Sequence, residues 1–501
     1  MKMDSLNKKR ETRILFILIG VVLGCSLFWR FYNYADRWTL SQDQARDGII
    51  GLYAVQNHVL PLIGPPSSAG AFSFGPFYYW LITLFTLTIP VVNGPWIGFT
   101  LISVITTILF FFIGNYLGGK FNGFIFGLLA AFSSEFVFHS SDMLNPIPIA
   151  LLTTLAFLFI IKIVDQQRLF FSLYLGIVIG LAINFHLQAL GLLVIIPAVS
   201  YFNSFKIQQK FKVFGLSMLG FFITFIPLLI FNFSHQNILS QNIFLFLTAN
   251  ENNTGTSNNV LIDIISFWPQ LWGTTIAHIP VLGYALILLF LFAGVFSLGE
   301  RKSLTKSFYV ISITLLFQII FLFVYQGVRS PIYLIVFHPF FVFLTGWTIL
   351  NFYQFNKCLG IVIFVIILGF SIPANLKVIH NNESQISTIM AIKSVIDSKH
   401  FNSVNILSAD NSRMIGLPLY YLYLKENKIS NNGTTLIACE KKLVKDTDGV
   451  TEKWSCPINI PIIAENDIYK IYSKEALNQE QQKQFTEIKS EAIYNWLYTN
   501  Y

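Results

Sequence analysis

Residues 41–48, SQDQARDG, place two acids and an arginine directly after the first long apolar segment of the chain. An ionised aspartate such as Asp43 can act as a general base, and the guanidinium of Arg46 can pair with a carboxylate or a phosphate. Ser41 followed three residues later by Gln44 is a capping box, and apolar residues recur at helical spacing after it. The sequence therefore predicts a helix that begins at this octet and carries Asp43 in its first turn.

The first turn of a helix favours the carboxylate form of an aspartate. The helix dipole and Arg46, three residues further on, both act in this direction for Asp43, and Asp47 completes a small charged cluster. Two interpretations remain open from these residues alone. The cluster either carries a general base at a membrane surface, or only keeps an interfacial helix hydrated.

A second group of polar residues lies among apolar segments further along the chain, at Glu135, His139 and Asp142. Asn145 with Pro146 would supply the N-cap and the first-turn proline of the next helix, which leaves Asp142 for another task. A solvated loop acid is the alternative interpretation of Asp142.

The histidines also show a pattern. With the topology that the positions of the basic residues predict, all 8 fall on the outer side of the membrane or in the outer half of a predicted span. Long outer loops collect polar residues, which explains most single cases, but His186 and His338 lie inside apolar runs. An ionisable group in such a run is costly and usually faces a cavity, so both are candidate binding residues.

Composition sets the class of protein that must position these residues. The 501 residues are 54% hydrophobic and 12% charged, which is typical of a polytopic membrane protein. Charge and asparagine density rise after about residue 375. We therefore expect a transmembrane domain over 1–374 and a small extracytoplasmic α/β domain over 375–501.

About eleven transmembrane helices are expected. The first, Ile14 to Phe31, is followed by no small-residue cleavage site, and the basic residues that precede it hold its start in the cytoplasm. The others are expected at about 96–116, 121–138, 147–164, 169–186, 188–203, 213–232, 276–298, 307–327, 331–350 and 358–374.

The apolar segment 77–90 is short for a span and ends in proline. If it crossed the membrane, the basic loops at Lys120, Lys162, Arg168, Lys206 and Arg301 would all lie outside, against the positive-inside rule. We therefore expect an interfacial or re-entrant helix within one large outer loop, about 33–95. The C-terminal domain then lies outside, and the net charge of +8 reflects cytoplasmic lysines and arginines and requires no nucleic acid.

The four cysteines divide by compartment. Cys25 and Cys358 fall in predicted spans, where a thiol behaves as a small hydrophobe. Cys439 and Cys456 fall in the outer tail, where a disulfide can persist, and the sequence leaves open whether they form one.

The motifs of the first outer loop resemble those of the C-type glycosyltransferase superfamily, and more narrowly the bacterial relatives of protein O-mannosyltransferases and lipid A aminoarabinose transferases. Further motifs follow in the same order, so that the resemblance covers about residues 14–374. The matching stretches are 43–46 (DQAR), 60–66 (LPLIGPP), 75–80 (GPFYYW), Asp142 with 145–146 (NP), 180–186 (GLAINFH), 331–334 (PIYL) and 338–339 (HP).

This resemblance implies the transfer of one sugar from a polyprenyl phosphate to an acceptor at the outer membrane face, with inversion at the anomeric carbon. Asp43 matches the catalytic base and Asp142 the second acid, which would orient a substrate. The lipid bilayer and the lipid-linked donor are the implied partners, and the class of the acceptor is left open. The further substrate-binding candidates are Arg46, Asp47, Glu135, His139, His186, Arg329, Tyr333 and His338.

The sequence departs from the family pattern at two places. Gln44 replaces the usual second acid of the first motif, and Phe74 and Gly75 stand where relatives often have a lysine or histidine before the proline. Since that basic residue would help to hold the donor phosphate, Arg46, Arg329 and His338 are the substitutes to consider.

Two questions remain open at this level. A transporter, a lipid flippase or a lipid-linked glycan ligase is the alternative class, although the acids cluster at the outer face and no internal repeat is found. No metal-ligand spacing is evident, so no cofactor is assigned and the participation of a divalent cation stays undecided.

Overall fold

The structure is a computed structural model that describes residues 2–67, 70–248, 263–299, 305–324, 331–380, 385–408, 413–446, 449–454, 462–465, 469–473 and 485–499. The chain divides into two compact units. The first contains residues 1–34, 62–78 and 99–380, and the second contains residues 35–61, 79–98 and 381–501. The second unit thus combines the C-terminal region with two segments of the predicted first outer loop. The domain boundary near residue 375 stays a prediction.

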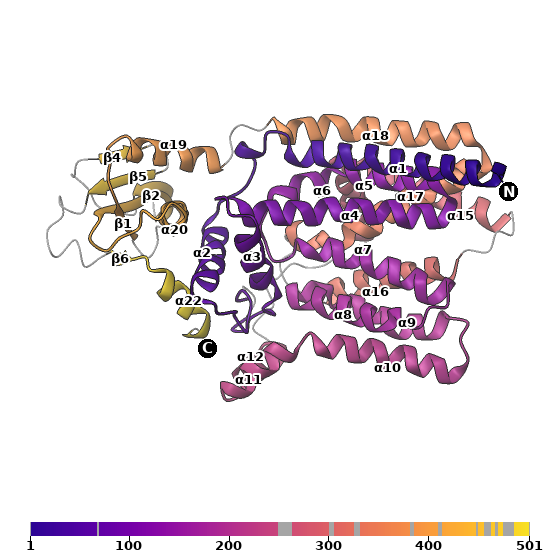
Figure 1. The fold of residues 1–501 in the computed structure, drawn as a ribbon, viewed down its shortest axis with the longest axis horizontal. Coiled ribbons are helices and arrows are strands. Elements are labelled where there is room, and N and C mark those ends of the chain that lie inside the picture. Colours follow the sequence, from indigo (N-terminus) through magenta and orange to yellow (C-terminus); the bar gives the residue numbers. More distant parts are fainter. Residues whose placement is uncertain are drawn as a thin grey trace. The chain divides into compact units, whose positions relative to one another are not determined.

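The first unit is helical. Its first half comprises α1 (Lys2–Phe31), α4 (Gly94–Gly118, from Phe99), α5 (Lys120–Phe132), α6 (Ser134–Phe138), η2 (His139–Ser141), α7 (Pro148–Ile160), η3 (Ile161–Asp165), α8 (Phe171–Phe185), η4 (Leu187–Val194) and α9 (Ile195–Phe202). Its second half comprises α10 (Ile207–Ile223), α11 (Ile226–Ser234), α12 (Ile238–Thr248), η6 (Asp263–Phe267), α14 (Trp268–Ala277), α15 (Leu282–Gly299), α16 (Lys306–Val324), η7 (Pro331–Phe337), α17 (His338–Phe355) and α18 (Lys357–Ile379). Most of these helices run side by side as a bundle (Figure 1).

The length and hydropathy of the helices identify the candidate membrane spans. Within the described residues, five helical segments can cross a membrane, and up to eight can if each of three sharply bent pairs forms one span. The five are Arg10–Phe31, Gly94–Gly118, Pro148–Asp165, Pro331–Phe355 and Lys357–Ile379. The chain is therefore a multi-pass membrane protein. The total of eleven stays a prediction, because α8, η4 with α9, and α16 are apolar but shorter.

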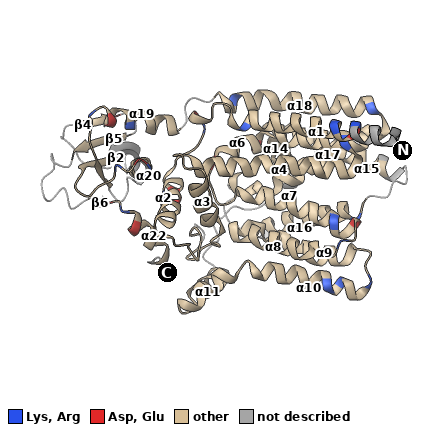
Figure 2. Ribbon diagram, in the orientation of Figure 1, with Lys and Arg blue, Asp and Glu red and all other residues tan. Residues whose placement is uncertain are grey.

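Basic residues of the first unit gather at one end of its bundle. Figure 2 shows several of them at the end where the N-terminus lies. The Nζ atom of Lys120 donates to the Glu11 carbonyl and lies 3.2 Å from its carboxylate, and Lys306 donates to the hydroxyl of Ser204. This is the arrangement that the positive-inside rule leads one to expect for a cytoplasmic end.

The second unit contains a small mixed sheet. Its elements are η1 (Tyr34–Asp36, from Ala35), α2 (Gln42–Asn57), α3 (Phe77–Thr88, from Tyr79), α19 (Gln385–Asp397), β1 (Val404–Ser408), α20 (Arg413–Lys425), β2 (Thr434–Asp446), β3 (Gly449–Trp454), β4 (Ile462–Glu465), β5 (Tyr469–Ser473), β6 (Thr486–Glu487) and α22 (Ser490–Thr499). The strand order is β4-β5-β2-β1-β6, with β3 paired to β2. Among the strands of the described residues, β1 and β2 pair in parallel, with Val404 opposite Thr434, and every residue of β1 is buried.

A compact core holds this sheet together. Leu407, Ile437, Cys439 and Tyr472 form a buried cluster from three neighbouring strands. Cys439 is disulfide-bonded, and Cys456 lies outside the described residues, whereas Cys25 and Cys358 are free. The C-terminal region therefore contains a small sheet with helices, as expected, whereas its existence as a separate domain stays a prediction.

One local prediction is wrong. Asn145 does not cap the next helix, because the cap position is Ile147 and α7 begins at Pro148. The side-chain amide of Asn145 donates instead to the carbonyl of Phe185 at the end of α8, at 2.8 Å. The second proline, at 148, sets the helix start, since proline fits the first helical turn.

Close approach of α8 and α10 depends on glycine. A Cβ atom on Gly176 would lie 1.8 Å from the carbonyl oxygen of Ser217, and one on Gly220 would lie 2.1 Å from that of Leu173. Small residues of this kind let membrane helices pack backbone against backbone. These two glycines therefore set the distance between α8 and α10.

We predict that Gly176→Leu destabilises the protein by about 1 to 3 kcal/mol or more, because the added side chain must force the helices apart. The midpoint of thermal unfolding in detergent measures this. Gly215→Leu is the matched control, since a Cβ atom on Gly215 of α10 meets nothing within 4 Å. Equal midpoints for the two variants would contradict the packing described here.

Candidate functional site

The charged octet forms the start of α2 as predicted. The Ser41 hydroxyl accepts a hydrogen bond from the backbone N–H of Gln44 at 3.4 Å, and the Gln44 side chain accepts one from the backbone N–H of Ser41 at 2.9 Å. This reciprocal pair is a capping box, which satisfies two of the N–H groups left without partners at a helix start. Asp43 is thereby fixed in the first turn.

Arg46 joins two carboxylates of different exposure. Its Nη1 atom donates to Oδ1 of Asp43 and its Nε atom to Oδ1 of Asp47, both at 2.8 Å. The Asp43 side chain is 65% exposed, whereas that of Asp47 is 4% exposed. Asp43 therefore presents its carboxylate to the surroundings of α2, and Asp47 lies beneath as a buried anchor.

Tyr79 of α3 completes the anchor. Its hydroxyl donates to Oδ1 of Asp47 at 3.0 Å, and its ring is buried. Burial raises the pKa of the Asp47 carboxyl, and the positive charge of Arg46 opposes this rise. Burial alone would lower the pKa of the Arg46 guanidinium, but Asp47 and Asp43 outweigh it and raise that pKa. Arg46 thus remains charged and keeps both carboxylates oriented.

The C-terminal region contributes directly to the packing of α2 within the second unit. The Tyr53 and Tyr494 rings stack with centroids 4.7 Å apart, and the Arg46 guanidinium lies over the Trp496 ring at 5.4 Å from its centroid. A Cβ atom on Gly48 would lie 2.8 Å from the ring of Tyr421, so α20 also approaches α2 closely.

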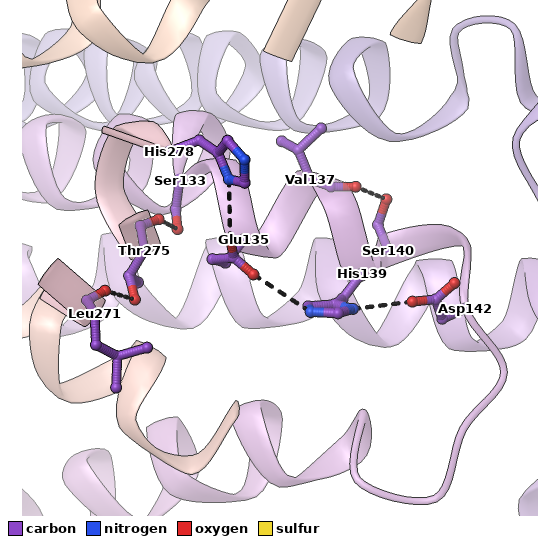
Figure 3. Close-up of polar contacts among 9 residues, drawn as sticks. All are labelled: Ser133, Glu135, Val137, His139, Ser140, Asp142, Leu271, Thr275 and His278. Carbon is purple, nitrogen blue, oxygen red and sulfur yellow. Dashed lines mark hydrogen bonds and ion pairs between the residues drawn. The ribbon is translucent and has the colours of Figure 1, made fainter. Parts of the chain in front are cut away.

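A second cluster, in the first unit, joins Glu135, His139 and Asp142 with His278 (Figure 3). Nδ1 of His139 lies 2.9 Å from Oδ2 of Asp142, and Nε2 lies 3.3 Å from Oε2 of Glu135. The other oxygen of Glu135 lies 3.3 Å from Nδ1 of His278. The imidazole of His139 is therefore held between two carboxylates, an arrangement in which both ring nitrogens act as donors when the ring is protonated.

His338 lies near this cluster. Its ring is roughly parallel to that of His139, with centroids 6.3 Å apart, and only 1% of the residue is exposed. Within the described part of the chain, its Nδ1 atom has no hydrogen-bond partner. A buried ring nitrogen of this kind is suited to a polar ligand.

His186 lies in a separate stack of rings in the first unit. Its ring packs between those of Phe74 and Tyr333, with centroids 4.9 Å and 4.5 Å away. The backbone N–H of Gly75 donates to the carbonyl of Asn184 at 2.8 Å. The motifs at 75–80, 180–186 and 331–334 thus meet in space, and a Cβ atom on Gly75 would lie 1.8 Å from the side-chain oxygen of Asn184.

The predicted site residues therefore form three groups. Asp43, Arg46 and Asp47 belong to the second unit; Glu135, His139, Asp142 and His338 form one cluster of the first unit, and His186 and Tyr333 form another. Arg329 lies outside the described residues.

Sequence reasoning missed three contributors, which are Tyr79, Trp496 and His278. Tyr79 lies in the quoted motif GPFYYW, which was a usable signal, whereas nothing in the sequence links Trp496 to Arg46. Across the described ranges, no three histidine, cysteine, aspartate or glutamate side chains are arranged to hold a metal ion. The four acids and histidines of Figure 3 contact one another in a chain and do not converge on one point.

The comparison with solved structures concerns the fold. The chain shares its overall fold with ArnT, so the predicted resemblance is confirmed at the level of fold. It is similar to ArnT from Cupriavidus metallidurans, with a TM-score of 0.57 and 9% identity to the apo structure, over 92% of this chain and 98% of that one. The structure of the same ArnT bound to undecaprenyl phosphate gives 0.56, 10% identity, and 92% and 99% coverage.

A weaker match is the oligosaccharyltransferase of Archaeoglobus fulgidus in complex with zinc and sulfate, with a TM-score of 0.46 and 12% identity over 76% of this chain. The chain spans about half of that protein's length, 55%. No family model and no curated protein sequence matches the chain.

We predict that Arg46→Ala lowers the free energy of unfolding by about 3 to 5 kcal/mol, because it leaves the buried Asp47 without its ionic partner. Asp43→Asn should change that free energy little, since an exposed ion pair contributes little. Chemical denaturation of the two variants in the same detergent measures the difference. Equal losses would mean that Asp47 is not the buried anchor.

Proposed function

We propose that the protein is a membrane glycosyltransferase that transfers a single sugar from a polyprenyl phosphate to an acceptor at the outer face of the membrane. The observation that carries this proposal is the ArnT-like fold, which extends over 92% of the chain. The ArnT structure in this comparison is bound to undecaprenyl phosphate. The exposed carboxylate at the capped start of α2 supplies the chemistry that such a transfer requires.

Asp43 is the proposed general base. As the acceptor hydroxyl oxygen forms a bond to the anomeric carbon of the donor, its proton passes to the Asp43 carboxylate. The bond between the anomeric carbon and the phosphate oxygen breaks, and its electron pair leaves with the polyprenyl phosphate. Attack from the face opposite the phosphate inverts the anomeric configuration.

Arg46 and Asp47 are positioning residues in this proposal. Arg46 donates one charge-assisted hydrogen bond to Asp43 and is itself held by the buried Asp47, so it limits the orientations of the Asp43 carboxylate. Arg46 thus serves Asp43, and the remaining candidates to stabilise the departing phosphate are Arg329 and His338. Asp142, held by His139, would orient a substrate together with Glu135.

Asp43 and Glu491 give a matched test of the base. We expect Asp43→Asn to lower the rate of sugar transfer by about 10²- to 10⁴-fold, because the amide accepts no proton. Membranes that contain each variant are incubated with labelled polyprenyl-phosphate sugars, and loss of donor and transfer to lipid, glycan and protein fractions are counted. Glu491→Gln, which removes an exposed carboxylate of α22, should transfer at the parental rate.

Two results would contradict the proposal in different ways. An Asp43→Asn variant with parental activity would remove the base assignment. A parent protein that consumes no lipid-linked sugar but moves it across vesicle membranes would be a flippase, the alternative function.

The proposed topology has the N-terminus in the cytoplasm and the C-terminal unit outside. Cys358 is free and lies at the very start of α18, next to the basic residue Lys357, which the charge pattern assigns to the cytoplasmic side. We therefore expect Cys358 to react in intact cells with a membrane-permeant maleimide but not with an impermeant one. A cysteine introduced at the exposed Asn495 of α22 should react with both, and the reverse pattern would invert the topology.

A further inference from the structure

A pocket of about 200 Å³ lies wholly within the second unit. Its walls come from the start of α2, the end of β1, the middle of α20 and the segment from β6 into α22. The residues that matter for its chemistry are Gln42, Arg46, Leu417, Glu487, Lys489 and Trp496. Only Arg46 among them has a role in the function proposed above.

The pocket joins an apolar surface to charges of both signs. Leu417, Ile493 and the ring of Trp496 supply the apolar part. Arg46 and Lys489 supply hydrogen-bond donors, and Glu487 supplies acceptors. A sugar ring has the matching chemistry, because its C–H groups form an apolar face and each hydroxyl both donates and accepts.

The charged groups are held in place by the fold. Oε1 of Glu487 accepts a hydrogen bond from Asn405 at 3.0 Å, and its Oε2 lies 2.9 Å from the ammonium of Lys489. The Trp496 ring is fixed against the guanidinium of Arg46. A ligand would therefore meet a largely prearranged surface, which lowers the entropic cost of binding.

The size of the pocket limits its occupant. Drug-sized ligands occupy pockets of about 300 to 1,000 Å³, so 200 Å³ suits a single ring. The side chain of a serine or threonine acceptor would leave most of this volume empty. The volume thus favours one sugar residue over the hydroxyl side chain of a peptide.

The pocket adjoins the proposed base. Gln42 and Arg46, which line it, flank Asp43 in the first turn of α2, and Arg46 donates to the Asp43 carboxylate at 2.8 Å. We propose that the pocket binds one sugar ring of the acceptor, so that the acceptor is a glycan, free or attached to a lipid. The link to transfer rests on the proposed function, whereas the binding of a sugar does not.

In the transfer step, a hydroxyl oxygen of the bound ring would form the new bond to the anomeric carbon of the donor. Its proton would pass to Asp43, and the polyprenyl phosphate would leave with the electron pair of the broken bond. The product is then a glycan extended or decorated by one residue.

Saturation-transfer NMR on the full chain in lipid nanodiscs tests the binding without any donor. The probes are the methyl glycosides of glucose, galactose, mannose and N-acetylglucosamine, together with a serine- and threonine-containing peptide. We expect at least one glycoside to bind the parent protein, and Ala492→Phe, which fills the pocket, to weaken this binding about tenfold or more. Asn495→Phe, which adds the same ring at an exposed position of α22 outside the pocket lining, should bind as the parent does.

If Ala492→Phe does not fold, which the midpoint of thermal unfolding would reveal, a second pair of variants tests the same pocket. Trp496→Phe keeps a ring face and should retain more glycoside binding than Trp496→Ala. The proposal is overturned if no glycoside binds the parent, if Ala492→Phe binds as the parent does, or if only the peptide signal responds to the filled pocket.

These outcomes separate the inference from the proposed function. If the protein binds a sugar but consumes no donor, the proposed transferase activity is contradicted and the sugar-binding pocket still stands. Donor consumption with a parental acceptor KM in Ala492→Phe would leave the transferase standing and remove the acceptor pocket.

Discussion

The buried carboxylate of Asp47 is the group on which the arrangement of the first cluster depends. A charge with so little exposure is tolerated in a protein interior only where donors surround it, and Arg46 and Tyr79 supply them. That requirement fixes the guanidinium, and the guanidinium in turn fixes the exposed Asp43 and stacks on Trp496. The position of the exposed Asp43 carboxylate is therefore determined by the need of a buried carboxylate for hydrogen-bond donors.

Residues far along the chain from α2 hold this cluster in place. Helix α2 carries glycine at 48, where the ring of Tyr421 lies too close for a side chain, and tyrosine at 53, where Tyr494 stacks. Both partners belong to the C-terminal region. The small sheet, with its buried strand β1 and the core around Cys439, is the platform from which α20 and α22 make these contacts.

The sequence predicts those features whose signal is local. The capping box at Ser41 and Gln44 appears because neighbouring residues determine it. The ion pair of Arg46 with Asp43 follows from helical spacing in the same way. Asn145 shows the limit of such local signals. It stands where an N-cap residue is expected, but its side-chain amide donates to a backbone carbonyl of another helix.

Contacts between distant segments had no such signal. The pairings of Arg46 with Trp496 and of Glu135 with His278 depend on tertiary packing, which periodicity and propensity do not encode. The same holds for the number of spans, since bent pairs such as Ile207–Ile223 with Ile226–Ser234 look continuous in hydropathy.

The stacking of α22 on α2 has a consequence for biosynthesis. Arg46 and Tyr53 are translated long before their stacking partners, Trp496 and Tyr494. Until the end of the chain is made, α2 therefore lacks these two contacts. The cluster around Asp43 reaches its final packing only once α22 has folded against it. The final packing of α2 therefore requires that the chain has been made at least as far as Trp496.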